Sequence, residues 1–136
     1  MPALYTSLRV ETAWLEAQQA FVFKAQPMTI CAYTVDCADV LDLRDPATLV
    51  EAGIKPTDLS CAWEDLASRK QPVPSWLVVK SLLSRGIAGV IVPSFAFRAR
   101  PDDVNAVFWN WGDSKPHLFQ VVDHLGRLPR DDQSWR

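Results

Sequence analysis

The sequence has few histidines, cysteines and glycines, and each shortage argues against a class of function. Its two histidines, His117 and His124, lie seven residues apart without a cysteine or carboxylate at metal-site spacing, which argues against zinc. The three cysteines, Cys31, Cys37 and Cys61, form no CxxC pair, and we interpret them as buried, reduced thiols. We therefore expect no bound metal.

Several sequence motifs are missing as well. The five glycines form neither a Walker A loop nor a dinucleotide fingerprint, and no serine lies in a Gly-x-Ser-x-Gly elbow. The apolar runs are shorter than the roughly 20 residues of a membrane helix, and the first residues do not resemble a secretory signal. A net charge of −2 disfavours nucleic acid and anionic membranes as direct partners. These absences indicate a cytoplasmic protein.

The length and composition predict one soluble globular domain. The chain has 136 residues, of which 49% are hydrophobic and 22% charged, and this is enough apolar material for a buried core. Alternating and β-branched patterns predict strands at residues 3–7, over 28–43 as one long or broken strand, and at 88–92, 105–111 and 117–123. The last strands follow each other without an intervening helix, which favours an α+β fold over a doubly wound sheet.

Helical periodicity and end signals predict the helices. They are expected from residue 10 to about 23, over 46–52, around 60–68 and over 76–85. Asp45 and Ser75 are suitable N-caps, and Pro46 can occupy the first helical position. Gly53 and Gly86 are suitable left-handed helix stops. We expect residues 72–74 to break the chain between two helices.

The first predicted helix has an apolar stripe that we expect to face the core. The stripe consists of Val10, Ala13, Trp14, Ala17 and Phe21. Glu16 lies on the flank of this stripe, where it can border a cleft. We also expect Trp14 and Trp109 to be buried, and Trp135 to be exposed in a polar C-terminal tail.

Polar side chains at predicted strand ends and on the adjoining helix are the candidate site residues. They are Tyr5, Ser7, Glu16, Ser94 and Asn105. Such positions often carry sites, because a rigid scaffold holds polar groups at an edge. Four of these residues also have a purely structural interpretation: an interior ring for Tyr5, a solvated helix residue for Glu16, and turn or bulge residues for Ser94 and Asn105.

Four segments together resemble one protein family. They are PALYTSLRVETAWLEA at residues 2–17, PSW at 74–76, GVIVPSFA at 89–96 and NAVFW at 105–109. Their order and approximate spacing are similar to those of RES-domain proteins from Pro2 to about Pro129. On this resemblance we expect a RES-like domain over residues 1–129, N-terminally incomplete, and a polar tail over 130–136.

The resemblance implies a fold and an activity. RES proteins have an ADP-ribosyltransferase-like core, a mixed sheet with flanking helices. They are toxins of bacterial toxin–antitoxin modules, which consume NAD+ by phosphorolysis or hydrolysis of the nicotinamide–ribose bond or transfer ADP-ribose to a protein. The implied substrate is therefore NAD+, and the implied partners are a small Xre-type antitoxin and, for a transferase, a protein acceptor.

The resemblance also assigns roles to the candidate residues. Glu16 and Ser94 would be the Glu and Ser of the family's name, and with Tyr5 they would be catalytic. Tyr5, Ser7, Ser94 and Asn105 would bind NAD+, with Tyr5 lining the nicotinamide pocket. The family's Arg would lie upstream of this tyrosine, outside the sequence. We therefore expect little NAD+ turnover from these 136 residues, and the alternative is a catalytically silent fold that binds an antitoxin.

Overall fold

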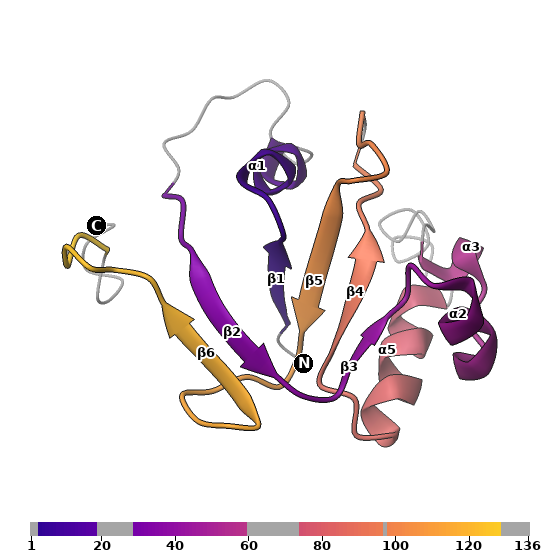
Figure 1. Cartoon of the computed structure of the whole chain (residues 1–136). Coiled ribbons are helices and arrows are strands. Elements are labelled where there is room, and N and C mark those ends of the chain that lie inside the picture. The colour runs from indigo at the N-terminus through magenta and orange to yellow at the C-terminus, as the bar shows by residue number, and fades with distance from the viewer. Residues whose placement is uncertain (1–2, 19–28, 60–73, 97, 129–136) are drawn as a thin grey trace.

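The part of the chain that the structure describes contains two β-sheets and four helices, which form an α+β fold, as the order of predicted elements indicated. The computed structural model describes residues 3–18, 29–59, 74–96 and 98–128 (Figure 1). The strands are β1 (Leu4–Ser7), β2 (Tyr33–Cys37), β3 (Val40–Asp42), β4 (Gly89–Pro93), β5 (Val104–Phe108) and β6 (His117–Val121). The helices are α1 (Val10–Gln18), α2 (Pro46–Ala52), α3 (Pro56–Leu59) and α5 (Pro74–Ser84).

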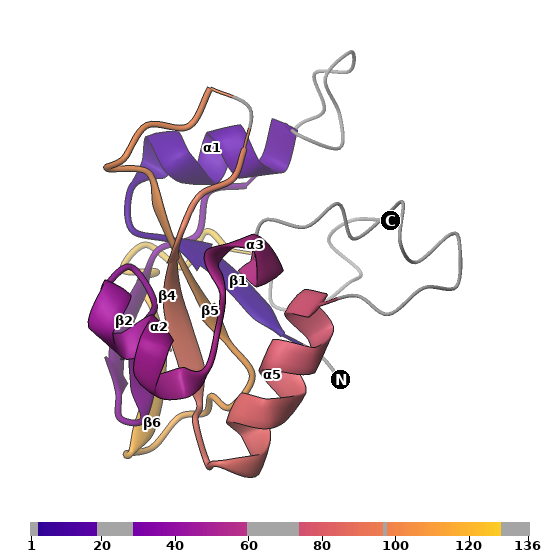
Figure 2. The ribbon, with the colours of Figure 1, turned by 90° about the vertical axis from the view of Figure 1, so that its right-hand side faces the viewer.

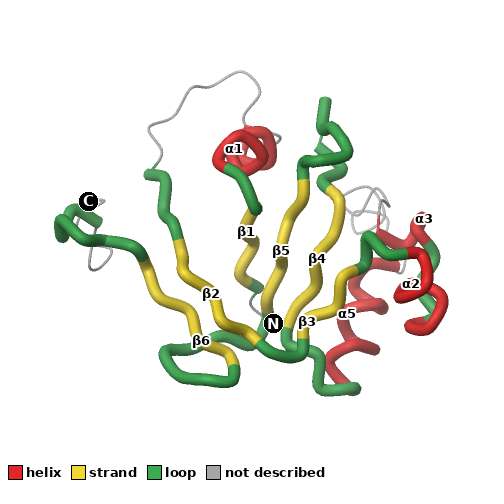
Figure 3. Tube along the Cα trace, viewed as in Figure 1, coloured by secondary structure: helices red, strands yellow, loops and turns green. Residues whose placement is uncertain are grey.

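The larger sheet has the strand order β1-β5-β4-β3, and β2 and β6 form the second sheet. The β3–β4 pair is parallel, and the other pairs are antiparallel. The two sheets diverge from the junction between β2 and β3, and α1 lies across the open end, beyond β1 and β5 (Figures 1 and 3). Helix α5 lies on the opposite side of the larger sheet from β2 and β6 (Figure 2). The two helices thus occupy different places: α1 lies at one end of the larger sheet, and α5 covers one of its faces (Figures 1 and 2).

Each face of the larger sheet has its own buried cluster. Leu82 of α5 packs with Val90 of β4 and with the predicted core residue Trp109 on the helical side. Phe108 packs with Phe119 of β6 on the other side, with ring centroids 4.6 Å apart and an interplanar angle of 80°. Because side chains alternate along β5, neighbouring residues of this strand lie on opposite faces and contribute to both clusters.

The predicted ends of α2 and the predicted stop after α5 are confirmed. The Asp45 side chain accepts a hydrogen bond from the Ala47 amide at 3.1 Å, and α2 begins at Pro46. Gly53 ends α2 with φ 71°, and Gly86 follows α5 with φ 77°, a conformation that costs glycine little.

Two predictions around α5 are wrong. The break was expected over residues 72–74, but Pro74 is the first residue of α5, where its missing N–H is not needed by the helix. Ser75 therefore lies within the first turn and does not precede the helix as a cap. Residues 72 and 73 lie outside the described residues. The short helix α3 was not predicted. The helix expected at 60–68 lies outside the described residues, as do residues 19–23 and 129–136, and with them Trp135.

The segment predicted as one long or broken strand is broken, and its two parts belong to different sheets. β2 pairs with β6, whereas β3 pairs with β4. Asp39 lies between them with φ 62°, a left-handed conformation that aspartate tolerates better than most residues. The expected buried thiols are also wrong for this segment, since Cys31 is exposed and Cys37 is half-buried. Cys61 lies outside the described residues.

The expected orientation of α1 is wrong. Val10 and Trp14 are 58% and 49% exposed, whereas Thr12 is completely buried. The helix thus directs a polar face at the sheet, because the groups that it meets there are themselves polar. The interior ring expected for Tyr5 is wrong as well, since this residue is 77% exposed on edge strand β1. In the described part of the chain, no helix has the length and apolar character needed to span a membrane.

Candidate active site

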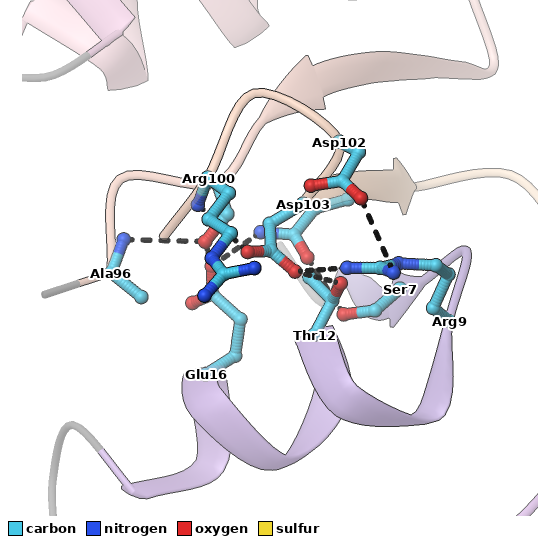
Figure 4. Close-up of polar contacts among 10 residues, drawn as sticks. Ser7, Arg9, Thr12, Glu16, Ala96, Arg100, Asp102 and Asp103 are labelled. Carbon is cyan, nitrogen blue, oxygen red and sulfur yellow. Dashed lines mark hydrogen bonds and ion pairs between the residues drawn. The ribbon is translucent and has the colours of Figure 1, made fainter. Parts of the chain in front are cut away.

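Four of the five predicted site residues meet where α1 crosses the larger sheet. Ser7 ends β1 and lies directly opposite Asn105 of β5, so the two side chains share one face of the sheet. Asn105 is also opposite Val92 of β4, and Ser94 follows that strand. Glu16 projects from α1 toward these strand ends (Figure 4).

A chain of hydrogen bonds connects these four residues. The Ser7 hydroxyl donates to Asn105 Oδ1 at 2.7 Å, and Asn105 Nδ2 donates to Glu16 Oε1 at 2.5 Å. The Ser94 hydroxyl donates to the same glutamate oxygen. The Ala96 amide donates in turn to Ser94 Oγ at 3.2 Å. Each group therefore orients the next, and Glu16 is held by donors from two different strand ends.

Tyr5 lies beside this chain of hydrogen bonds. It precedes Ser7 by two residues on β1, and alternation along a strand directs both side chains to the same face. Its ring is largely exposed. The structure thus places an accessible aromatic ring next to the Ser7 end of the hydrogen-bonded chain.

A second polar cluster holds α1 one turn before Glu16, and sequence reasoning missed it. Its centre is Asp103, which is 3% exposed and immediately precedes β5. Asp103 Oδ1 accepts hydrogen bonds from Thr12 Oγ1 at 2.6 Å and from an Arg9 guanidinium nitrogen at 2.9 Å. Its other oxygen accepts from the Arg100 amide at 2.8 Å. Arg9 also forms an ion pair with Asp102 at 3.3 Å (Figure 4).

These donors favour the charged form of Asp103. The hydrogen bond from the Arg100 amide, with those from Thr12 and Arg9, lowers the pKa of Asp103 from 3.8 to about 2, although desolvation opposes the shift. The same contact with Asp103 raises the pKa of Arg9. One sequence signal was available, because Thr12 and Glu16 are four residues apart and so share one face of α1.

An apolar groove of about 760 Å³ lies between the two sheets. Leu4, Ile91 and Phe108 line it from the larger sheet, and Tyr33 and Val35 line it from β2. Alternation along β5 places Phe108 and Asn105 on opposite faces. The groove and the Glu16 cluster are therefore separated by the sheet and approach each other at edge strand β1, where Ser7 also borders the groove.

The Glu16 cluster has the character of a site for a reaction that develops positive charge. A fixed carboxylate stabilises such charge more effectively than a mobile one, because it needs no reorganisation during the reaction. Hydroxyl and amide groups beside it can hydrogen-bond a polyhydroxylated substrate. Within the described ranges, no group of three or more His, Cys, Asp or Glu residues could hold a metal ion.

Comparison with known proteins gave one match. A protein-family model described as the RES domain matches residues 1–131 of the chain. No curated protein and no solved structure matches it.

Proposed function

The chain belongs to the RES domain family, and we propose that it cleaves the nicotinamide–ribose bond of NAD+ as the toxin of a toxin–antitoxin module. RES domains are associated with such modules and with NAD+ consumption. The observation that best supports the proposal is the position of Glu16, whose carboxylate oxygen accepts hydrogen bonds from Ser94 and Asn105 at the end of the sheet.

In the proposed reaction, Glu16 supplies the main electrostatic stabilisation of the transition state. When the nicotinamide–ribose bond breaks, its electron pair leaves with nicotinamide, which becomes neutral. Positive charge then develops on the ribose carbon and its ring oxygen. The negative charge of Glu16 stabilises this oxocarbenium-like state more than the ground state, and only such differential stabilisation accelerates the step.

The other site residues bind NAD+ and orient both the substrate and Glu16. Tyr5 offers its exposed ring for stacking on nicotinamide, and Ser7 lies two residues further along the same strand face. Ser94 and Asn105 orient Glu16 and offer their remaining hydrogen-bonding capacity to the ribose or a phosphate. A bound substrate held in this way reacts faster because its orientation is already set.

The second step transfers the ribose carbon to an acceptor. A lone pair of the acceptor forms the new bond to that carbon, and water or a protonated nucleophile releases a proton. Water makes the reaction a hydrolysis, phosphate makes it a phosphorolysis, and a protein side chain makes it an ADP-ribosylation. The fate of ADP-ribose therefore identifies the acceptor.

The test measures NAD+ loss by the purified chain with and without added phosphate. Glu16→Gln keeps an oxygen that can accept from Ser94 and Asn105 but removes the charge, so we expect it to abolish NAD+ loss. Glu11→Gln is the matched control, because Glu11 is an exposed acidic residue on the same helix. Because we expect little turnover from these 136 residues, the assay uses a high protein concentration and a long incubation. No NAD+ loss by the folded chain under these conditions, or equal loss by both variants, contradicts the proposed reaction.

The proposed partner is an Xre-type antitoxin. The exposed apolar residues Leu8, Val10 and Trp14 support a protein-binding surface around α1, since aromatic and apolar side chains are enriched in interface cores. Val10→Glu should weaken antitoxin binding in a titration, whereas Val50→Glu, at an exposed valine of α2, should not. Antitoxin binding without NAD+ loss would favour the catalytically silent alternative.

A further inference from the structure

Asp103 is the residue through which the three parts of the Glu16 cluster are joined. Its side chain accepts a hydrogen bond from Thr12 of α1. Its main-chain carbonyl accepts one from the Ser94 amide at 2.8 Å. It also precedes Asn105 by two residues along the chain. A single buried residue thus contacts the helix that carries Glu16, contacts Ser94 directly, and lies two residues from Asn105 in sequence.

The contact with Thr12 sets the position of Glu16. Thr12 and Glu16 are separated by four residues, about 6 Å along the helix axis at 1.5 Å per residue, and lie on the same face. Fixing Thr12 against Asp103 therefore fixes both the rotation of α1 and its displacement along its axis. Arg9 reinforces the same contact from the residue before the helix.

Apolar packing contributes little to holding α1. Val10 and Trp14 are largely exposed, Leu15 is half-buried, and among the described residues neither buried cluster includes a side chain of α1. Thr12 is the one described residue of this helix that is fully buried. The helix is held mainly by hydrogen bonds and the Arg9 ion pair, which are directional and specify one orientation. The loss of one of these bonds should shift α1 more than the loss of one apolar contact shifts a helix in a packed core.

We infer that Asp103 is a positioning residue, which acts through Thr12 and the Ser94 amide to hold the Glu16 carboxylate where positive charge develops on the ribose. The inference rests on the proposed NAD+ cleavage. Asp103 does not touch the substrate. It acts through Thr12 and Glu16, and Glu16 is the residue that faces the reacting atoms. Its role differs from that of a residue that only stabilises the fold, because removal of its contacts should lower the rate constant of the folded protein.

The kinetic test compares three variants. Thr12→Val removes the hydroxyl without changing the shape of the side chain, and we expect kcat to fall roughly 10- to 100-fold with KM nearly unchanged, since a misplacement of about 1 Å can cost about 100-fold. Thr12→Ser keeps the hydroxyl and should restore most of the loss. Arg44→Gln removes an exposed ion pair with Asp42 of β3, the edge strand opposite β1, and serves as the control. An equal kcat in Thr12→Val and wild type overturns the inference.

A structural measurement separates this inference from the proposed function. Amide hydrogen exchange in Asp103→Asn and Thr12→Val should accelerate in α1 (Val10–Gln18) while α5 (Pro74–Ser84) keeps its protection. If the wild-type chain shows no NAD+ turnover, the proposed function fails, and the exchange data still decide whether Asp103 positions α1. Unchanged exchange in α1, or equal acceleration in both helices, overturns the positioning role. If Asp103→Asn fails to fold, Thr12→Val and Thr12→Ser supply the same comparison.

Discussion

Replacement of Asn105 by Asp should place two negative charges in contact at the centre of the site. The two side chains have the same shape, and the oxygen that accepts from Ser7 is retained. The group that changes is the amide nitrogen, which lies 2.5 Å from Glu16 Oε1. A favourable hydrogen bond thus becomes a repulsion between two carboxylates.

Coulomb's law gives the expected loss of stability in Asn105→Asp. Two unit charges whose centres relax to about 4 Å repel by about 4 kcal/mol at an effective dielectric constant of 20 and by about 1 kcal/mol in bulk water. The site is half-buried, so we expect Asn105→Asp to lower the free energy of unfolding by roughly 1–4 kcal/mol at pH 8. With a urea m-value of about 2 kcal/mol/M, the midpoint should fall by roughly 0.5–2 M.

The pH dependence distinguishes charge repulsion from a simple loss of packing. The repulsion in the folded variant exists only while both of its carboxyls are charged, so it weakens as the solution becomes acidic. The stability of the variant therefore falls as pH rises. Urea unfolding at pH 5 and pH 8 measures the difference. Asn110→Asp, at an exposed asparagine just after β5, is the matched control.

Two results would refute this reasoning. If Asn105→Asp and Asn110→Asp lose equal stability at pH 8, Asn105 does not face the glutamate. If the deficit of Asn105→Asp is the same at both pH values, its cause is not the repulsion between charges. Neither result depends on any enzymatic activity.

Two further predictions concern acid stability and core packing. Because the folded pKa of Asp103 is about 2, below its ordinary 3.8, its ionisation should stabilise the fold above about pH 4, and this contribution should disappear as pH falls toward 2. Acid titration followed by circular dichroism should show a shallower stability loss for Asp103→Asn, and an equal slope would contradict the assignment. Gly89→Ala should cost about 1–3 kcal/mol in urea unfolding, since its Cβ would lie 2.6 Å from Phe108 Cδ1 and 2.8 Å from the Val107 carbonyl oxygen. Gly112→Ala, with no atom within 4 Å of the added Cβ, should be nearly neutral, and equal effects of the two substitutions would show that the overlap is not the cause.

The parts of the fold that depend on local chemistry could be predicted from the sequence. The Asp45 cap, the Gly53 stop and the Gly86 stop depend on interactions within a few residues, and all three occur as expected. The strand positions followed from alternating patterns, which are also local. The break at Asp39 was one of two open possibilities, and the pairing of its two sides with different sheets depends on distant strands.

The orientation of α1 could not be predicted, because periodicity identifies two faces of a helix and does not say which one meets the sheet. The decisive partner of Thr12 is Asp103, 91 residues away in the sequence. Nothing local to the helix indicates that a buried carboxylate will face it. The apolar stripe with Val10 and Trp14 therefore suggested the wrong side.

The candidate site residues were selected by position and by resemblance, and the structure brings Ser7, Glu16, Ser94 and Asn105 together. Tyr5 was expected inside, and its edge-strand location explains its exposure. The contacts made by Asp103 were missed because its importance arises from tertiary structure. The four-residue spacing of Thr12 and Glu16 was the available clue.

The polar attachment of α1 gives this helix a thermal behaviour unlike that of the core. Detachment of a helix that buries little apolar surface exposes little of it to water, so the heat capacity change is small. Hydrophobic attachment weakens on cooling, whereas hydrogen bonds and ion pairs do not share that dependence. Salt also screens the partly exposed Arg9 pair. Warming and high ionic strength should therefore release α1 from the sheet before the clusters around Leu82 and Phe108 unfold, while cooling should leave it in place.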